Sequence, residues 1–113
     1  MPSKSKAKGN RFERECVNIA KQHGLKAKRA WGSDGRSLGL HPEVDITIEE
    51  YTVQCKVRKR IAEWLKPSEQ IGDSHLQLVK ESRGQIYAIM PMTKLMEIIT
   101  QVKTLRKATE KKQ

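Results

Sequence analysis

The sequence predicts a single α/β domain in which helices cover a β-sheet. A length of 113 residues suits one domain with a modest core and is too short for two. The apolar residues recur with helical spacing near both ends of the chain and alternate with polar residues in between. The resulting order of helix, strand, loop, hairpin, helix, hairpin and helix is typical of a sheet layered with helices.

The first helix carries an acidic residue on its apolar side. Residues 1–9, MPSKSKAKG, are rich in lysine, so we expect a flexible basic arm there. A helix is predicted from about Asn10 to His23, with Asn10 as N-cap and Gly24 as stop. Its apolar arc comprises Phe12, Cys16, Val17, Ile19 and Ala20. Glu13 falls inside that arc, which is costly for a carboxylate unless a cationic group lies nearby.

A β-hairpin is predicted in the middle of the chain. Residues 25–31 are expected to form a strand, and residues 32–43, with three glycines and a proline, a mobile binding loop. The hairpin that follows has Glu49 and Glu50 at its turn. This register puts three apolar pairs on one face: Ile48 with Tyr51, Ile46 with Val53, and Val44 with Cys55.

The opposite face of this hairpin gathers polar groups. It carries Asp45 directly across from Gln54, with Lys56 two residues further along. A first helix packed on the sheet edge would bring Glu13 to Asp45. Carboxylate and amide oxygens are ligands that Mg²⁺ prefers, and a lysine stabilises charge developing on a phosphate. The cluster therefore predicts metal-dependent phosphodiester hydrolysis.

The last third of the chain completes the alternation of elements. A short helix is predicted over residues 60–66, before Pro67. Residues 75–81 and 85–90 are predicted to pair as two strands. Thr93 is expected to cap a final helix, whose apolar arc comprises Leu95, Met96, Ile98, Ile99, Val102 and Leu105.

The charge of the chain indicates a polyanionic partner. There are 23 Lys and Arg residues against 13 Asp and Glu residues, a formal net charge of +10, although charge kept for solubility alone stays an alternative. The chain lacks a long apolar run and a signal-peptide pattern, so we expect no membrane and a cytoplasmic location, in a prokaryotic cell or a phage-infected host. Cys16 and Cys55 lack metal-binding spacing and are expected to stay reduced, packing as small hydrophobes.

Six segments of the chain resemble one nuclease family. They are ERE at 13–15, RAWGSDGRS at 29–37, VDI at 44–46, QCKVRKR at 54–60, EWL at 63–65 and IYAIMPMTKLMEII at 86–99. In order and spacing they resemble the archaeal-type Holliday-junction resolvases of the PD-(D/E)XK superfamily. One interpretation is that the chain is a phage or viral member of that family. The resemblance implies a single-domain, restriction-endonuclease-like fold with a central mixed β-sheet flanked by helices. It also implies a homodimer that nicks four-way DNA junctions symmetrically, with Mg²⁺ or, as a substitute, Mn²⁺.

The resemblance assigns roles to individual residues. The catalytic set that it implies is Glu13, Ser33, Asp45, Gln54 and Lys56. The implied metal ligands are Glu13, Asp45, Gln54 and the backbone carbonyl of Cys55. The predicted nuclease domain spans residues 10–107, and residues 108–113 form a basic C-terminal tail.

Two residues depart from the family pattern. Val44 stands where proline usually precedes the aspartate, although Pro42 lies close by. Gln54 stands where the family usually has glutamate. Three explanations of Gln54 stay open: a natural amide ligand, an engineered Glu→Gln change, or a relative that binds DNA without cleaving it.

The main functional prediction is a structure-selective endonuclease for branched DNA. The residues expected to contact DNA are Lys4, Lys6, Lys8, Arg11, Arg14, Arg29, Arg36, Arg58, Lys59 and Arg60. Trp64 and Leu65 are candidates for the dimer surface or for the core. A related nuclease for other branched or flap DNA and a non-catalytic basic nucleic-acid-binding module are the alternatives.

Overall fold

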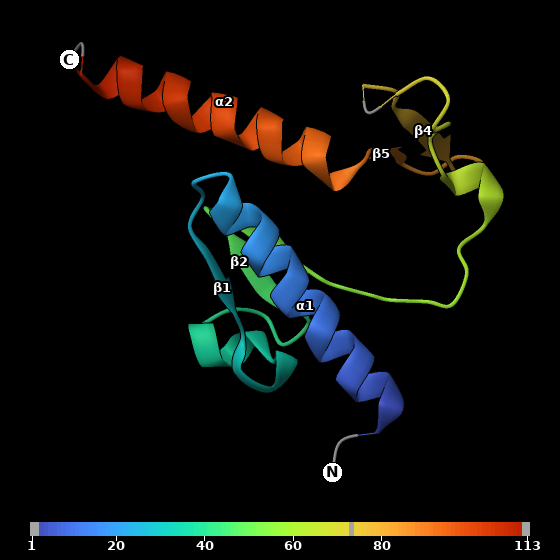
Figure 1. The fold of residues 1–113 in the computed structure, drawn as a ribbon, viewed down its shortest axis with the longest axis horizontal. Helices are drawn as coiled ribbons and strands as arrows, with labels where there is room; N and C mark the ends of the chain where they lie inside the picture. The colour runs from blue at the N-terminus through green and yellow to red at the C-terminus, as the bar shows by residue number, and fades with distance from the viewer. Residues whose placement is uncertain (1–2, 73, 112–113) are drawn as a thin grey trace. The chain divides into compact units, whose positions relative to one another are not determined.

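The computed structural model describes residues 3–72 and 74–111, which contain helices and β-strands as an α/β chain should (Figure 1). The chain divides into two compact units, Met1–Arg58 and Lys59–Gln113. Residues 54–62, where the division falls, contain no helix or strand. No helix among the described residues is long and apolar enough to cross a membrane.

The first unit begins with helix α1, Lys4–Gln22. The helix starts earlier than predicted because the Ser3 side chain caps it, accepting a hydrogen bond of 3.1 Å from the Lys6 backbone N–H. The prediction of a flexible arm was therefore wrong for residues 4–9, whose lysines and alanine are good helix formers. Asn10 lies inside the helix and not at its cap. The helix does end where predicted, since Gly24 adopts φ 78°.

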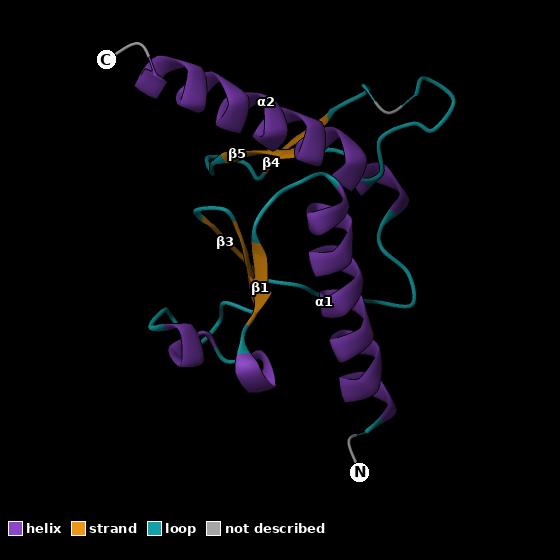
Figure 2. Cartoon of the chain, turned by 60° about the vertical axis from the view of Figure 1, so that its left-hand side comes forward, coloured by secondary structure: helices purple, strands orange, loops and turns teal. Residues whose placement is uncertain are grey.

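A three-stranded antiparallel sheet follows in the order β1-β2-β3 (Figure 2). Its strands are β1, Ala27–Arg29, β2, Ile46–Ile48, and β3, Tyr51–Val53. The predicted hairpin register is confirmed, since Ile46 pairs with Val53 and Ile48 with Tyr51. The third predicted pair lies beyond the strand ends. Glu49 adopts φ 52° at the turn, and its carboxylate accepts the Lys26 backbone N–H at 2.6 Å.

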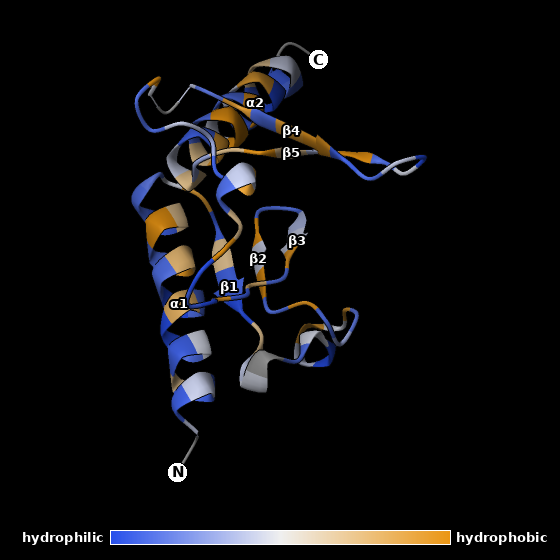
Figure 3. Ribbon diagram, turned by 90° about the vertical axis from the view of Figure 1, so that its right-hand side faces the viewer, coloured by the Kyte–Doolittle hydropathy of each residue, from blue (hydrophilic) through white to orange (hydrophobic). Residues whose placement is uncertain are grey.

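The core of this unit lies between α1 and the sheet. Apolar residues recur along α1 (Figure 3), and the helix packs against β1 and β2. The buried apolar residues of the unit are Cys16, Val17, Ala20, Leu25, Ala27, Ala30, Val44, Ile46 and Ile48. Glu13 is buried among them at 4% exposure, so the helical arc predicted from the sequence is the side that packs.

The predicted binding loop contains two short 3₁₀ turns, Trp31–Ser33 and Gly35–Leu38. Gly35 is buried, and a Cβ there would collide with the His41 carbonyl oxygen. The segment is therefore packed locally and requires a glycine at that position. Trp31 is 85% exposed and takes no part in the core.

The second unit contains a hairpin and a helix. Strands β4, Gln77–Lys80, and β5, Ile86–Ile89, pair antiparallel as predicted. The helix predicted over residues 60–66 is reduced to a 3₁₀ turn, Glu63–Leu65. Helix α2 spans Met92–Lys111 and begins one residue before its predicted cap, Thr93, because the Pro91 carbonyl already accepts the Lys94 N–H at 3.1 Å.

Two corrections concern larger predictions. Residues 108–111, predicted as part of a tail, continue α2, since the helix-forming sequence meets no glycine or proline there. The described strands form two antiparallel sheets, of three and two strands, and not one central mixed sheet. The pairs β2–β3 and β4–β5 are joined by short turns, which close small loops at low entropic cost, whereas β1 and β2 pair across the longer segment 30–45.

Candidate active site

The buried carboxylate of Glu13 lies on α1 and has a cationic partner, as its position requires. Arg29 Nε, at the end of β1, donates a hydrogen bond of 3.1 Å to Glu13 Oε1, and these two side chains form an ion pair. Arg29 Nη2 also donates to Asn10 Oδ1 at 3.0 Å, one helical turn before Glu13. The guanidinium of Arg29, a residue that stays predicted to contact DNA, orients the Glu13 carboxylate.

The sequence contained a signal for this pairing that the prediction missed. In a strand, alternate residues point to the same face. Ala27 is buried, Lys28 is exposed, and Arg29 returns to the face of Ala27 with its side chain 29% exposed. The alternation therefore directs Arg29 toward α1, where Glu13 needs a cation. Nothing in the sequence pattern pointed to Asn10 as the second acceptor.

Removal of Arg29 tests this ion pair. We expect Arg29→Met to lower the free energy of unfolding by about 1–3 kcal/mol, because the buried Glu13 carboxylate loses a charged hydrogen-bond donor. Lys28→Met changes the exposed neighbour on the same strand and is expected to cost less than about 0.5 kcal/mol. Urea unfolding of both variants measures the difference. Equal effects of the two substitutions would mean that the ion pair contributes nothing to folding.

The carboxylate of Asp45 is held at the start of β2. Its Oδ2 accepts the backbone N–H of Cys55 at 2.7 Å. The Asp45 backbone is fixed on both sides, since its N–H donates to the Val53 carbonyl at 2.9 Å and its carbonyl accepts the Ala30 N–H at 2.8 Å. Asp45, directly before β2, is thus bonded to β3 and to the residue that follows β1, and its side chain ties it to the segment that carries Gln54 and Lys56.

The two carboxylates act on one side chain, the thiol of Cys55. Burial raises the pKa of Cys55 to about 12, and the nearby Cys16 thiol and the negative charges of Asp45 and Glu13 act in the same direction. Burial also raises the pKa of Cys16. Cys55 is therefore a weakly acidic thiol within the predicted catalytic segment, between Gln54 and Lys56.

The other predicted catalytic residues lie at the surface. Gln54 and Lys56 are both exposed. Gln54 lines a hollow of about 220 Å³ together with His41, Glu43, Val44, Thr52 and Val53. Glu43 and His41 thus line the same hollow as the glutamine that stands where the family usually has glutamate. For Ser33 the structure describes the backbone, which belongs to a 3₁₀ turn.

A family comparison decides between the classes of protein that this geometry admits. The family described as archaeal Holliday junction resolvase (hjc) matches residues 4–111, nearly the whole chain. The chain belongs to this family. The resemblance drawn from the sequence is confirmed, and membership implies nuclease action on branched DNA. No curated protein and no solved structure matches the chain closely enough to extend the comparison.

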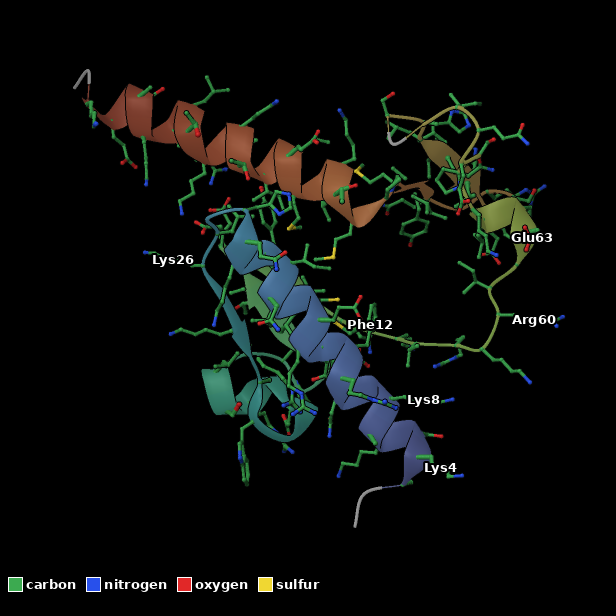
Figure 4. All side chains as sticks on the ribbon, in the orientation of Figure 1. Lys4, Lys8, Phe12, Lys26, Arg60 and Glu63 are labelled. Carbon is green, nitrogen blue, oxygen red and sulfur yellow. The ribbon has the colours of Figure 1, made fainter. Side chains whose placement is uncertain are left out.

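Most of the predicted DNA-contacting residues of this resolvase-family chain are accessible. Lys4, Lys6, Lys8, Arg11, Arg14, Arg36, Arg58, Lys59 and Arg60 are all exposed. Lys4 and Lys8 extend from the same side of α1, as their spacing of four residues requires (Figure 4). Arg36 makes a forked ion pair with Asp34, with a shortest distance of 2.6 Å, and its hydrogen bonds hold the pKa of Asp34 below its ordinary value.

The predicted metal ligands have the chemistry that a hard divalent cation takes. They are the carboxylate oxygens of Glu13 and Asp45, the amide oxygen of Gln54 and the Cys55 carbonyl, which are donor types that suit Mg²⁺ and Mn²⁺. Among residues 3–72 and 74–111, no group of three or more His, Cys, Asp and Glu side chains is gathered closely enough to hold a metal ion. Resolvases of this family are generally dependent on a divalent metal.

Proposed function

We propose that this resolvase-family protein is a structure-selective endonuclease that resolves four-way DNA junctions by symmetric, Mg²⁺-dependent phosphodiester nicking. The observation that carries the proposal is the hydrogen bond that Asp45 Oδ2 accepts from the Cys55 backbone N–H, because it holds this carboxylate at the residue between Gln54 and Lys56. Family membership supplies the nuclease class and the branched DNA substrate. The net charge of +10 suits a polyanionic partner.

Each residue of the site has a proposed role in hydrolysis. Glu13, Asp45, Gln54 and the Cys55 carbonyl would hold the cation, which activates water and offsets charge on the phosphate when bound. Arg29 fixes the Glu13 carboxylate, and the Cys55 N–H fixes that of Asp45. Lys56 is exposed and offers an ammonium group to a phosphate oxygen, where it stabilises negative charge that develops during the reaction. Ser33 is proposed to assist from the adjoining turn.

A nicking assay on a labelled four-way junction tests the proposal. With Mg²⁺ or Mn²⁺ we expect cleavage of the junction, no cleavage of a linear duplex of the same sequence, and no cleavage with a chelator present. Preferred cleavage of a flap or another branch would favour the related-nuclease alternative. Tight binding of the junction without cleavage under any metal would favour a binding module.

We also propose that the active form is a homodimer. Two nicks related by the two-fold symmetry of a junction require two equivalent active sites, which a C₂ dimer provides. Trp64, 66% exposed, and Leu65 are the proposed interface residues. The same assay, with each of the four strands labelled in turn, reports paired cuts in opposing strands if the dimer acts.

The remaining parts of the proposal rest on family membership. We propose the PD-(D/E)XK fold, and a nuclease domain over residues 10–107. We also propose a cytoplasmic location, in a prokaryotic cell or a phage-infected host. The proposed substrate, a four-way DNA junction, is the same in a prokaryotic cell and in a phage-infected host.

The salt dependence of junction binding tests the basic residues proposed to meet phosphates. Removal of one such cationic group should flatten the slope of log K against log salt concentration by about 0.9. The double variant Lys4→Gln, Lys8→Gln removes two charges from one side of α1, so we expect the slope to fall by about 1.8. Lys80→Gln, at an exposed position of strand β4 and outside the predicted DNA-binding set, is the matched control. An unchanged slope in the double variant would remove these lysines from the interface.

A further inference from the structure

The segment after β1 displays a large aromatic side chain to solvent. Trp31 is 85% exposed, the highest exposed fraction among the large hydrophobic residues that the structure describes. An exposed indole leaves a large apolar area in water, and tryptophan is enriched where a protein binds a partner. A single exposed apolar residue is common on a protein surface, so its surroundings decide whether it has a role.

The backbone of Trp31 is held in an ordered loop. Its N–H donates to Ser37 Oγ at 2.9 Å, and that hydroxyl donates to the Asp34 carbonyl at 3.0 Å. The Asp34 N–H donates in turn to the Trp31 carbonyl at 3.2 Å. Gly35, inside the loop, is buried. The indole therefore projects from a fixed segment, and little backbone freedom is lost when a ligand binds to it.

This loop is bonded directly to the candidate active site. Ala30, the residue before Trp31, is 1% exposed, and its N–H donates to the Asp45 carbonyl at 2.8 Å. Arg29, one residue earlier, donates to the Glu13 carboxylate at 3.1 Å. Trp31 thus follows immediately the two residues that contact the proposed metal ligands, and consecutive Cα atoms lie only about 3.8 Å apart. A DNA strand held for cleavage at those ligands would pass beside the indole.

The same segment carries exposed cationic side chains. Lys28 is exposed on β1, and the Arg36 side chain is 74% exposed beside Asp34. Proteins hold unpaired nucleotides with such combinations of cationic and aromatic groups, since phosphates meet the cations and bases stack on the ring. The surroundings of Trp31 therefore favour a nucleic-acid partner over an apolar protein surface.

We propose that Trp31 is a base-stacking residue that contacts a nucleobase at the branch point of the junction and favours branched over linear DNA. The branched substrate comes from the proposed function, on which this inference rests. Inside a continuous duplex both faces of each base are covered by its neighbours, whereas a base at an opened branch point offers one face to the indole. Stacking accepts any base, because every base has a π-face, so the contact recognises the shape of the junction and not its sequence.

Equilibrium binding of the full chain to a labelled four-way junction and to a linear duplex, with a chelator present, tests the proposal. Trp31→Ala is expected to weaken junction binding about tenfold, within the range for a lost base–aromatic stack. Duplex affinity should stay unchanged, and so should the slope of log K against log salt concentration, since stacking releases no counterions. Trp31→Phe should retain most of the junction affinity, because it keeps an aromatic ring.

Leu40→Ala is the matched control. Leu40 is an apolar residue of the same segment, 37% exposed, and its replacement should change neither affinity. Urea unfolding should give the same midpoint for Trp31→Ala as for the unsubstituted chain, because the exposed indole takes no part in the core.

Unchanged junction affinity in Trp31→Ala would overturn the base-stacking role. Equal losses of junction and duplex affinity, or a Trp31→Phe variant as weak as Trp31→Ala, would overturn it as well. A chain that binds junctions through Trp31 and yet nicks none with Mg²⁺ or Mn²⁺ would contradict the proposed nuclease and leave the stacking contact standing. Nicking by the unsubstituted chain, together with unchanged junction affinity in Trp31→Ala, would contradict the stacking contact alone.

Discussion

Asp45→Asn is expected to abolish nicking of a four-way junction while leaving junction affinity nearly unchanged. The substitution removes one negative oxygen proposed to hold the cation, and it removes no basic group that contacts phosphate. The asparagine carbonyl can still accept the Cys55 N–H that Asp45 Oδ2 accepts now, so the hairpin should stay folded. Loss of a direct ligand should cost at least about a hundredfold in rate, since outer partners alone cost up to that much.

Two neighbouring substitutions on α1 provide matched comparisons. Glu13→Gln should behave like Asp45→Asn, because it keeps the hydrogen bond from Arg29 and loses the charge. Glu15→Gln removes an exposed carboxylate from the same helix and should leave nicking unchanged. Single-turnover nicking rates and junction dissociation constants separate catalysis from binding. An essential Glu15 beside a dispensable Glu13 would mean that the helical arc has been assigned to the wrong side.

The hairpin and the burial of Glu13 could be predicted from the sequence because both follow from local periodicity. One register alone puts Ile46 opposite Val53 and Ile48 opposite Tyr51, and a slip by one residue would expose that face. The position of Glu13 on α1 follows from the helical period in the same way. The cation that Glu13 requires could also have been found, since strand alternation directs Arg29 toward it.

The features that were missed depend on interactions that the local pattern does not express. The flexible arm was predicted from lysine content, but a single side-chain hydrogen bond between Ser3 and the Lys6 N–H starts the helix. The hollow that joins Glu43 to Gln54 likewise arises from the path of the loop before β2.

Gln54→Glu is expected to lower the Mg²⁺ concentration needed for half-maximal nicking. Gln54 brings a carbonyl oxygen and no negative charge, and the affinity of a site for hard cations increases with ligand charge. We expect a shift of about tenfold, equivalent to about 1.4 kcal/mol of binding free energy. Without metal, the added charge should slightly weaken binding of the junction, because it opposes the attraction of Lys56 for phosphate.

The size of the change caused by Gln54→Glu distinguishes the three explanations of the glutamine. If Gln54 is a natural ligand, the unsubstituted chain already nicks the junction, and Gln54→Glu lowers the Mg²⁺ requirement only modestly. Glu43, which lines the same hollow, could then supply the compensating negative charge. In that case Glu43→Gln should raise the Mg²⁺ requirement, whereas Glu50→Gln, at the exposed hairpin turn, should not. If Gln54 replaces an original glutamate, the unsubstituted chain is nearly inert and Gln54→Glu restores activity by orders of magnitude. Failure of both forms to nick any branched DNA with Mg²⁺ or Mn²⁺ would leave a protein that binds junctions without cutting them, because the remaining basic residues still contact phosphate.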